Sequence, residues 1–320
     1  MPSTSSEDCR APSRLALAGL LLAASCTFTT APCHPRPVVA PLAATAAIPA
    51  VPMPTLSTFT ATSPGQWCGC LVGSGEQVQF QLRRTDGERR PLVVLVPILA
   101  GGEELMDNVA TRMQSHGYDV AFCARVAGAL KVGQRGRDLD ELFRRTVLHQ
   151  RLLLRWLRAE LPEAPELFAL GISLGGMVTT VLAAHEPDLA GVAICLSGGN
   201  IKELIAHSSE RRVQAWRQWR LDEDAVGDDH LRQELEQCLV HEPLHFAPMV
   251  ATERVLLVRA TFDTVIPGAN QDLLWESLGR PTRLSVPFGH YSSALAFNTI
   301  LDAVAAHFDA RRLAVAPAVP

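Results

Sequence analysis

Four features that mark other protein classes are missing from this 320-residue chain. Its net charge of −4 leaves no excess of positive charge, which argues against the basic surface of a nucleic-acid-binding protein. No apolar run reaches the length of about 20 residues that a membrane-spanning helix needs. The eight cysteines show no zinc-site spacing, and no segment repeats. Apolar residues make up 48% of the chain and charged residues 19%, which is typical of a globular enzyme.

The first 26 residues have the layout of an export signal. Arg10 and Arg14 precede the apolar run LALAGLLLAAS, and small residues end this run before Cys26. Charged, apolar and small residues in this order are typical of a secretory signal peptide. We therefore expect export, either to the periplasm or to a lipid anchor on a bacterial membrane.

The end of this segment, LAASC, resembles a bacterial lipobox. The resemblance implies that Cys26 is lipidated after cleavage and tethers the protein to a membrane, although Leu22 lies one position further from the cysteine than the usual pattern places it. An ordinary signal peptide cut near Ala24 and a frayed apolar terminus are the alternatives.

The remaining chain is expected to form three parts. Residues 27–75 are rich in Pro, Ala and Thr without periodicity, and we expect an extended linker. Residues 76–310 are expected to form the folded domain, with an insertion at about 200–247, and residues 311–320 a flexible tail. In an exported protein, the cysteines placed to form a disulfide are Cys33, Cys68 and Cys70.

Strand and helix patterns alternate from residue 76 onward. Short apolar runs that read as buried strands precede segments with helical periodicity, as at 118–123 and 138–162. This alternation predicts an α/β fold with a doubly wound, mainly parallel sheet. An Asp-Gly turn between 76–84 and 91–97 predicts an antiparallel hairpin at the edge of the sheet.

The stretch LFALGISLGGMVTT places Ser173 between a strand and a helix, flanked by Gly171 and Gly175. This Gly-x-Ser-x-Gly pattern is typical of a nucleophile elbow, a turn so sharp that the neighbours of the serine must be small. A plain glycine turn is the alternative. We expect side chains at both glycine positions to collide with the adjoining strand and helix, and Ser173 to be the catalytic nucleophile.

A serine nucleophile needs a base within hydrogen-bond reach, and the candidate is His290. It follows the last expected strand and a glycine. Asp263 follows the strand before that one, so it should emerge at the same edge of the sheet and orient the imidazole. The alternative for Asp263 is a turn or helix-capping residue ahead of Pro267, and Asp272 and Asp302 are weaker candidates for the same role.

The order Ser173, Asp263, His290 on these strands resembles the α/β-hydrolase superfamily over about residues 76–310. The segments DTVIP and GHYSS look like those of bacterial esterase-like and dienelactone-hydrolase-like members. The resemblance implies an eight-stranded sheet with an antiparallel second strand, a Ser-His-Asp triad and an acyl-enzyme intermediate. It also implies a helical lid in the insertion, where the tryptophans of ERRVQAWRQWRLDEDAV would line a substrate cleft or pack a helix onto the core.

Acyl transfer also needs N–H donors for the developing oxyanion. One is expected from Leu174, directly after the nucleophile. Relatives usually carry His-Gly in the loop that supplies the second, whereas this chain reads PILAGG. We choose Leu99 for the second donor and Ala100 as the next choice.

The string HEPLH at 241–245 matches the zinc-peptidase motif H-E-x-x-H. Pro243 would break the helix on which that motif depends, so zinc hydrolysis is the least favoured alternative. We therefore expect a serine hydrolase of carboxylesterase type that acts on a small acyl substrate without metal or organic cofactor, with no nucleic-acid partner. A non-catalytic binding lipoprotein of the same fold is the second alternative.

Overall fold

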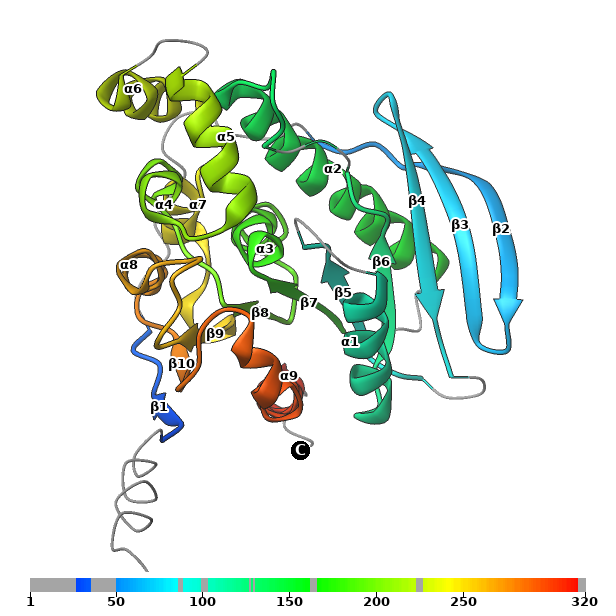
Figure 1. Ribbon diagram of the computed structural model, residues 1–320. Coiled ribbons are helices and arrows are strands. Elements are labelled where there is room, and N and C mark those ends of the chain that lie inside the picture. Colours follow the sequence, from blue (N-terminus) through cyan, green and yellow to red (C-terminus); the bar gives the residue numbers. More distant parts are fainter. Residues whose placement is uncertain are drawn as a thin grey trace, which may run out of the picture.

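A single ten-stranded sheet runs through the molecule, with helices on both faces (Figure 1). The computed structural model describes residues 27–35, 50–85, 89–98, 103–126, 128, 130–161, 166–222 and 227–315. The strands are β1 (Thr29–Ala31), β2 (Thr55–Ser63), β3 (Gln66–Gly73), β4 (Glu76–Arg83), β5 (Leu92–Val96), β6 (Asp119–Cys123), β7 (Leu167–Ile172), β8 (Gly191–Cys195), β9 (Val255–Ala260) and β10 (Thr282–Val286). The expected α/β class is confirmed, but within these described ranges the sheet has ten strands and not eight.

The strands lie in the order β1-β10-β9-β8-β7-β5-β6-β4-β3-β2. The six from β10 to β6 run parallel to one another. Most of their residues are buried on both faces, which explains the continuous apolar runs in the sequence. β4 is antiparallel to both β3 and β6, and β1 and β2 add one antiparallel strand at each edge of the sheet.

The segment 27–75, expected to be a linker, contains β1, β2 and β3. The linker expectation is wrong for these strands. β2 reads TLSTFTATS, and threonine and phenylalanine favour extended structure, yet every residue of the strand is exposed. An exposed edge strand lacks the burial pattern that separates a strand from a linker in a sequence. Its backbone groups are satisfied by pairing with β3.

A further expectation about the sheet is wrong. β4 does not form a hairpin with β5, because β6 lies between them, and the expected turn residues 86–88 fall outside the described part of the chain.

The described cysteines are all free thiols. Cys33 follows β1 at one edge of the sheet, whereas Cys68 and Cys70 lie on β3 near the opposite edge, so no disulfide joins them.

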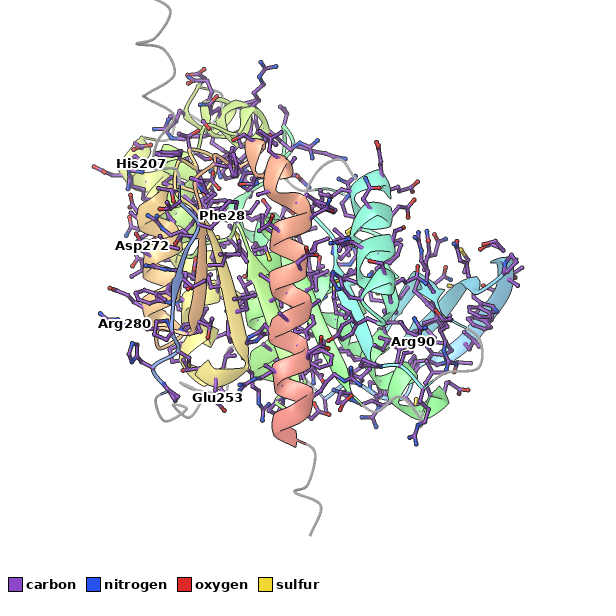
Figure 2. The ribbon with its side chains drawn as sticks, turned by 90° about the horizontal axis from the view of Figure 1, so that it is seen from below. Phe28, Arg90, His207, Glu253, Asp272 and Arg280 are labelled. Carbon is purple, nitrogen blue, oxygen red and sulfur yellow. The ribbon has the colours of Figure 1, made fainter. Side chains whose placement is uncertain are left out.

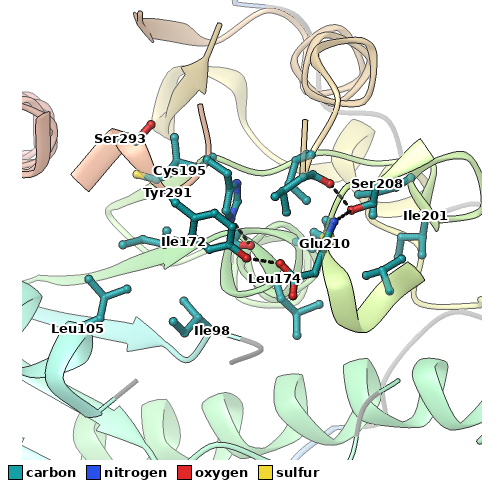
Figure 3. Close-up of a pocket in the computed structure, with 18 of the residues that line it drawn as sticks. Ile98, Leu105, Ile172, Leu174, Cys195, Ile201, Ser208, Glu210, Tyr291 and Ser293 are labelled. Atoms are coloured by element: carbon teal, nitrogen blue, oxygen red, sulfur yellow. Dashed lines mark hydrogen bonds between the residues drawn. The ribbon is translucent and has the colours of Figure 1, made fainter. Parts of the chain in front are cut away.

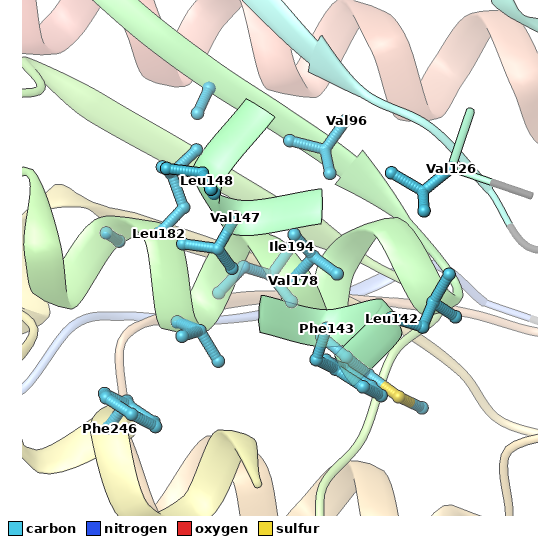
Figure 4. Close-up of a cluster of buried hydrophobic side chains, with 14 of the residues drawn as sticks. Val96, Val126, Leu142, Phe143, Val147, Leu148, Val178, Leu182, Ile194 and Phe246 are labelled. Atoms are coloured by element: carbon cyan, nitrogen blue, oxygen red, sulfur yellow. The ribbon is translucent and has the colours of Figure 1, made fainter. Parts of the chain in front are cut away.

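The helices divide between the two faces. α1 and α9 cover one face and lie side by side (Figure 2). The others pack on the opposite face, where Val147, Val178 and Ile194 belong to a large apolar core (Figure 4). The helices are α1 (Glu103–Ser115), α2 (Gly136–Glu160), α3 (Leu174–His185), α4 (Ile201–His207), α5 (Arg211–Asp222), α6 (Asp228–Cys238), α7 (Pro243–Phe246), α8 (Gly268–Ser277) and α9 (Phe297–Val315).

The insertion expected at about 200–247 is helical and consists of α4 to α7. The flexible tail was expected to begin at residue 311, but α9 continues to Val315, and only 316–320 lie outside the description. Arg311 explains part of this difference, because its side chain donates to the carbonyl of Glu253 and holds the last turns to the domain. No helix in the described ranges is long and apolar enough to cross a bilayer.

Candidate active site

Ser173 occupies a strained turn between β7 and α3. Its φ of 57° and ψ of −123° lie where a side chain is rarely tolerated, at a cost of about 1–3 kcal/mol. The turn is held because the Ser173 N–H donates to the carbonyl of Cys195 at the end of β8. The Oγ is thereby presented at the carboxyl end of the parallel strands, where the loops of this fold class form their sites.

The flanking glycines are required by close backbone contacts. A Cβ at Gly171 would lie 2.2 Å from both the carbonyl oxygen of Gly175 and the Oγ1 of Thr179 in α3. A Cβ at Gly175 would lie 2.4 Å from the carbonyl oxygen of Val96 at the end of β5. The expected collisions with the adjoining helix and strand are confirmed.

The structure brings Ser173, His290 and Asp263 into one hydrogen-bonded series. The Nε2 of His290 lies 3.0 Å from the Oγ of Ser173, and its Nδ1 lies 2.7 Å from the Oδ2 of Asp263. These residues follow β7, β10 and β9, which end at the same edge of the sheet. The arrangement can pass a proton from the hydroxyl to the imidazole while the carboxylate fixes the tautomer.

Asp263 makes both of the contacts that the sequence left as alternatives. The carboxylate is 5% exposed, and its Oδ1 accepts hydrogen bonds from the N–H groups of Val265 and Ile266. Its Oδ2 remains for His290. The turn that follows β9 therefore fixes the carboxylate in the orientation that the imidazole needs. Neither Asp272 nor Asp302 contacts His290: Asp272 binds Arg259 and Arg283, and Asp302 binds Arg112 and His116.

The first oxyanion donor predicted from the sequence is in a suitable place. Leu174 is the first residue of α3, so its N–H has no acceptor within the helix. The N-terminal end of a helix also favours a developing negative charge. Leu99 and Ala100, the choices for the second donor, lie outside the described residues.

An apolar cavity of about 290 Å³ opens beside Ser173 and His290 (Figure 3). We call it the acyl cavity. Helices α4 and α5 contribute Ile201, Leu204, Ile205 and Val213 to its lining, and α2 with the residues before it contributes Leu130, Leu139 and Phe143. Most of the lining residues are apolar, so the cavity suits a hydrocarbon group.

The lid tryptophans do not line this cavity. Trp216 is buried in the core, and its indole N–H donates to the carbonyl of Gln134 before α2. Arg220, on the same face of α5, is also buried and pairs with Glu234 of α6. These residues attach α5 to its neighbours. Packing, the second alternative for the tryptophans, is thus what the structure shows for Trp216.

Two lining residues of the acyl cavity that the sequence did not single out are hydrogen-bonded to each other. The hydroxyl of Tyr291 donates to the carboxylate of Glu210, just before α5 (Figure 3). This hydrogen bond raises the pKa of Tyr291 to about 12. Tyr291 also packs edge-on against the ring of His290, with the ring centroids 5.4 Å apart. It therefore links the histidine loop to the lid.

The residues of the HEPLH string have structural contacts. The carboxylate of Glu242 accepts hydrogen bonds from the N–H groups of Asn200, Ile201 and Leu244, so it caps both α4 and α7. His241 binds Asp140 of α2, while the ring of His245 contacts the carbonyl of Val240. Burial raises the pKa of Glu242. The two histidines contact different partners and do not converge with Glu242 on one face of a helix, which the zinc chemistry requires.

Comparison with solved structures gives the fold. An acetyl xylan esterase from Thermoanaerobacterium superposes with a TM-score of 0.55 at 16% identity, over 78% of this chain and 86% of that one. The chain has the α/β-hydrolase fold. An esterase from Pyrococcus furiosus matches this hydrolase fold with a TM-score of 0.54 at 11% identity, over 80% of this chain and 91% of the other. A Pyrobaculum calidifontis esterase superposes with a TM-score of 0.55 at 15% identity, over 78% of this chain and 86% of the other.

Sequence comparisons add nothing to this assignment. No protein-family model matches the chain. No curated protein matches it either. At the identities of the structural neighbours, the likeness is one of fold, so the chemistry must be argued from the site.

Proposed function

We propose that this protein is a serine hydrolase that cleaves an ester or related acyl bond. The observation that carries the proposal is the hydrogen-bonded series Ser173–His290–Asp263 at a strained turn beside an apolar cavity. The esterase names of the structural neighbours agree with this reaction type.

In the proposed reaction, the Oγ of Ser173 attacks the acyl carbon while His290 Nε2 takes its proton. The oxyanion that forms accepts a hydrogen bond from the Leu174 N–H. Asp263 stabilises the imidazolium, which then protonates the leaving group. Water, activated by the same imidazole, attacks the acyl-enzyme and releases the acid, so Ser173 recovers its proton.

Replacement of the nucleophile tests the proposal most directly. We expect Ser173→Ala to lower kcat/KM for p-nitrophenyl octanoate by about 10⁴-fold or more, since the attacking group is lost. A fluorophosphonate probe should label the wild-type protein at Ser173, and the variant should remain unlabelled. Ser115→Ala, at an exposed serine that ends α1, is the matched control. A loss of tenfold or less in Ser173→Ala would reject Ser173 as the nucleophile. A wild-type protein that neither hydrolyses the ester nor reacts with the probe would favour a binding protein of the same fold.

We also propose that the protein is exported and that Cys26 is lipidated. The support is the order of charges, apolar run and small residues before Cys26. Mass spectrometry of the N-terminus of the protein purified from its native host should show a chain that begins at Cys26 with an added lipid mass. An intact Met1 would contradict export, and an unmodified new terminus near Ala24 would contradict the lipid anchor alone.

A further inference from the structure

A second cavity, of about 250 Å³, adjoins the acyl cavity. Ile98 and Leu174 line both cavities, so the second cavity also reaches the residue directly after Ser173. It differs in charge, because Arg125, Lys131 and Arg212 line it. We call it the cationic cavity.

The described residues that line the cavity include no Asp or Glu. The neighbouring positions 99–102, 127 and 129, which are not described, are Leu, Ala and Gly in sequence and carry no charge. In the described part of the chain, the side chains of Lys131 and Arg212 make no ion pair; only their backbone N–H groups donate, to Gln134 and Glu210. Like charges gathered in this way create a local positive potential that attracts an anion.

Three other arginines of the insertion α4–α7 pair with its own carboxylates. Arg217 pairs with Asp228, Arg220 with Glu234, and Arg232 with both Glu203 and Asp228. Arg211 and Arg212 are exposed and make no ion pair within the described residues. Of these two neighbours, Arg212 lines the cationic cavity and Arg211 does not.

The charges of the two cavities indicate which part of an ester each cavity would bind. Glu210 is the charged carboxylate in the lining of the acyl cavity and would repel an anion there, while the remaining lining suits hydrocarbon. An apolar cavity of about 150 Å³ holds a benzene molecule, so the acyl cavity has room for roughly eight to twelve carbons. The alcohol side of the ester then faces the cationic cavity.

We propose that the substrate is an ester of an apolar acyl chain with an alcohol that bears a carboxylate or phosphate, which Arg125, Lys131 and Arg212 bind. Guanidinium groups suit both anions because their planar N–H groups match paired oxygens. The inference rests on the proposed hydrolase function and names the substrate class of the same site.

Three esters of one acid test it: 4-(octanoyloxy)benzoate, its neutral methyl ester, and 4-(octanoyloxy)phenyl phosphate. The methyl ester has a better leaving group than the carboxylate, so intrinsic reactivity works against the expected preference. We expect the wild-type enzyme to have a higher kcat/KM for at least one anionic ester than for the neutral one. Comparison of the two anions separates a carboxylate site from a phosphate site.

The double variant Lys131→Ala/Arg212→Ala should reduce the ratio of kcat/KM for the preferred anionic ester to that for the neutral ester by about tenfold, because charge-assisted hydrogen bonds are lost. Arg212→Lys should keep part of the ratio. Arg211→Ala is the matched control, an exposed neighbour that does not line the cavity. Added salt should also lower the wild-type ratio, since these cations are exposed.

The outcomes separate the two proposals. If hydrolysis of the neutral ester persists in Ser173→Ala, the hydrolase proposal is wrong. If that hydrolysis depends on Ser173 but the ratio is the same in the wild type, the double variant and Arg211→Ala, the anion site alone is rejected. A ratio that falls equally in Arg211→Ala would mean a general charge effect, which also rejects the site.

Discussion

The parallel and antiparallel strands of the sheet use their residues for different purposes. The parallel strands β7 and β9 are largely buried and β10 is partly buried, and each is followed at the same edge by one member of the series Ser173, Asp263 and His290. The antiparallel strands β2, β3 and β4 carry exposed residues. Their contacts include an aromatic group of Phe59, Trp67, Phe80 and Trp156 and an ionic group around Glu76, besides the buried residues that β3 and β4 add to the apolar core.

This difference shows which substitutions should change rate and which should change stability. Backbone turns after these strands fix Ser173, Asp263 and His290, so in the proposed reaction small changes there should alter turnover. Side-chain pairs hold the antiparallel strands to α2, far along the sheet from Ser173. Changes in those pairs should alter the free energy of unfolding and leave turnover intact.

The largest expected effect is from Asp263→Asn. The Oδ1 bonds from Val265 and Ile266 can persist, but the amide N–H₂ then faces His290 Nδ1 and favours the tautomer that cannot accept the proton of Ser173. We expect kcat/KM to fall by about 10⁴-fold while thermal stability changes little. Asp272→Asn, on the surface of α8, should keep most of the activity. Equal losses in both variants would mean that Asp263 has no special place in the site.

Gly175→Ala should have the next largest effect, on both turnover and stability. The new Cβ would lie 2.4 Å from the carbonyl oxygen of Val96, so backbone must move on one side of the nucleophile. We expect a loss of about 3 kcal/mol in the free energy of unfolding, measured with urea, and a large loss of activity. Gly227→Ala is the control, because nothing lies within 4 Å of its Cβ position. Wild-type turnover in Gly175→Ala would show that the turn tolerates more than its geometry implies.

The difference between the parallel and the antiparallel strands also explains what could be predicted from the sequence. The turn at Ser173 has a local signature, since the glycines that permit it lie within four residues and two buried runs frame it. β1 and β2 have no such signature. Thr29 pairs with Ser285 across most of the chain length, so proximity in sequence does not mark β1. β2 pairs with the next strand, β3, but it is exposed throughout, so no burial pattern marks it.

The contacts of helices α4 and α5 could not be predicted from the sequence either, because they join residues that are far apart in the chain. Tyr291 stands next to His290 in the sequence, but its partner Glu210 lies 81 positions away, and only the packing of α4 and α5 brings the two together. The cationic cavity combines Arg125, Lys131 and Arg212 in the same way. Charge runs in the lid sequence did not distinguish Arg212 from the paired arginines, because pairing depends on which helices come into contact.

Glu76→Gln should have the smallest effect, on stability alone and with a defined pH dependence. Glu76 on β4 accepts hydrogen bonds from Arg145 of α2, and these lower its pKa from the ordinary value of 4.5 to about 2. His149 adds a further contact. Because the pKa is lower in the folded state, the carboxylate stabilises the fold fully above about pH 4.5, and this contribution is lost as the pH falls towards 2.

We therefore expect Glu76→Gln to lower the free energy of unfolding by about 1–2 kcal/mol at pH 7, with the difference from wild type shrinking below pH 4.5. Urea unfolding at several pH values measures this, with ester turnover at pH 7 as the second readout. Glu141→Gln is the matched control, since Glu141 forms an exposed pair with Arg144 within α2 and should contribute only about 0.3 kcal/mol. A difference that does not vary with pH would show that the Glu76 charge has no stabilising role. A loss of turnover without a loss of stability would show that the antiparallel strands act on the chemistry after all.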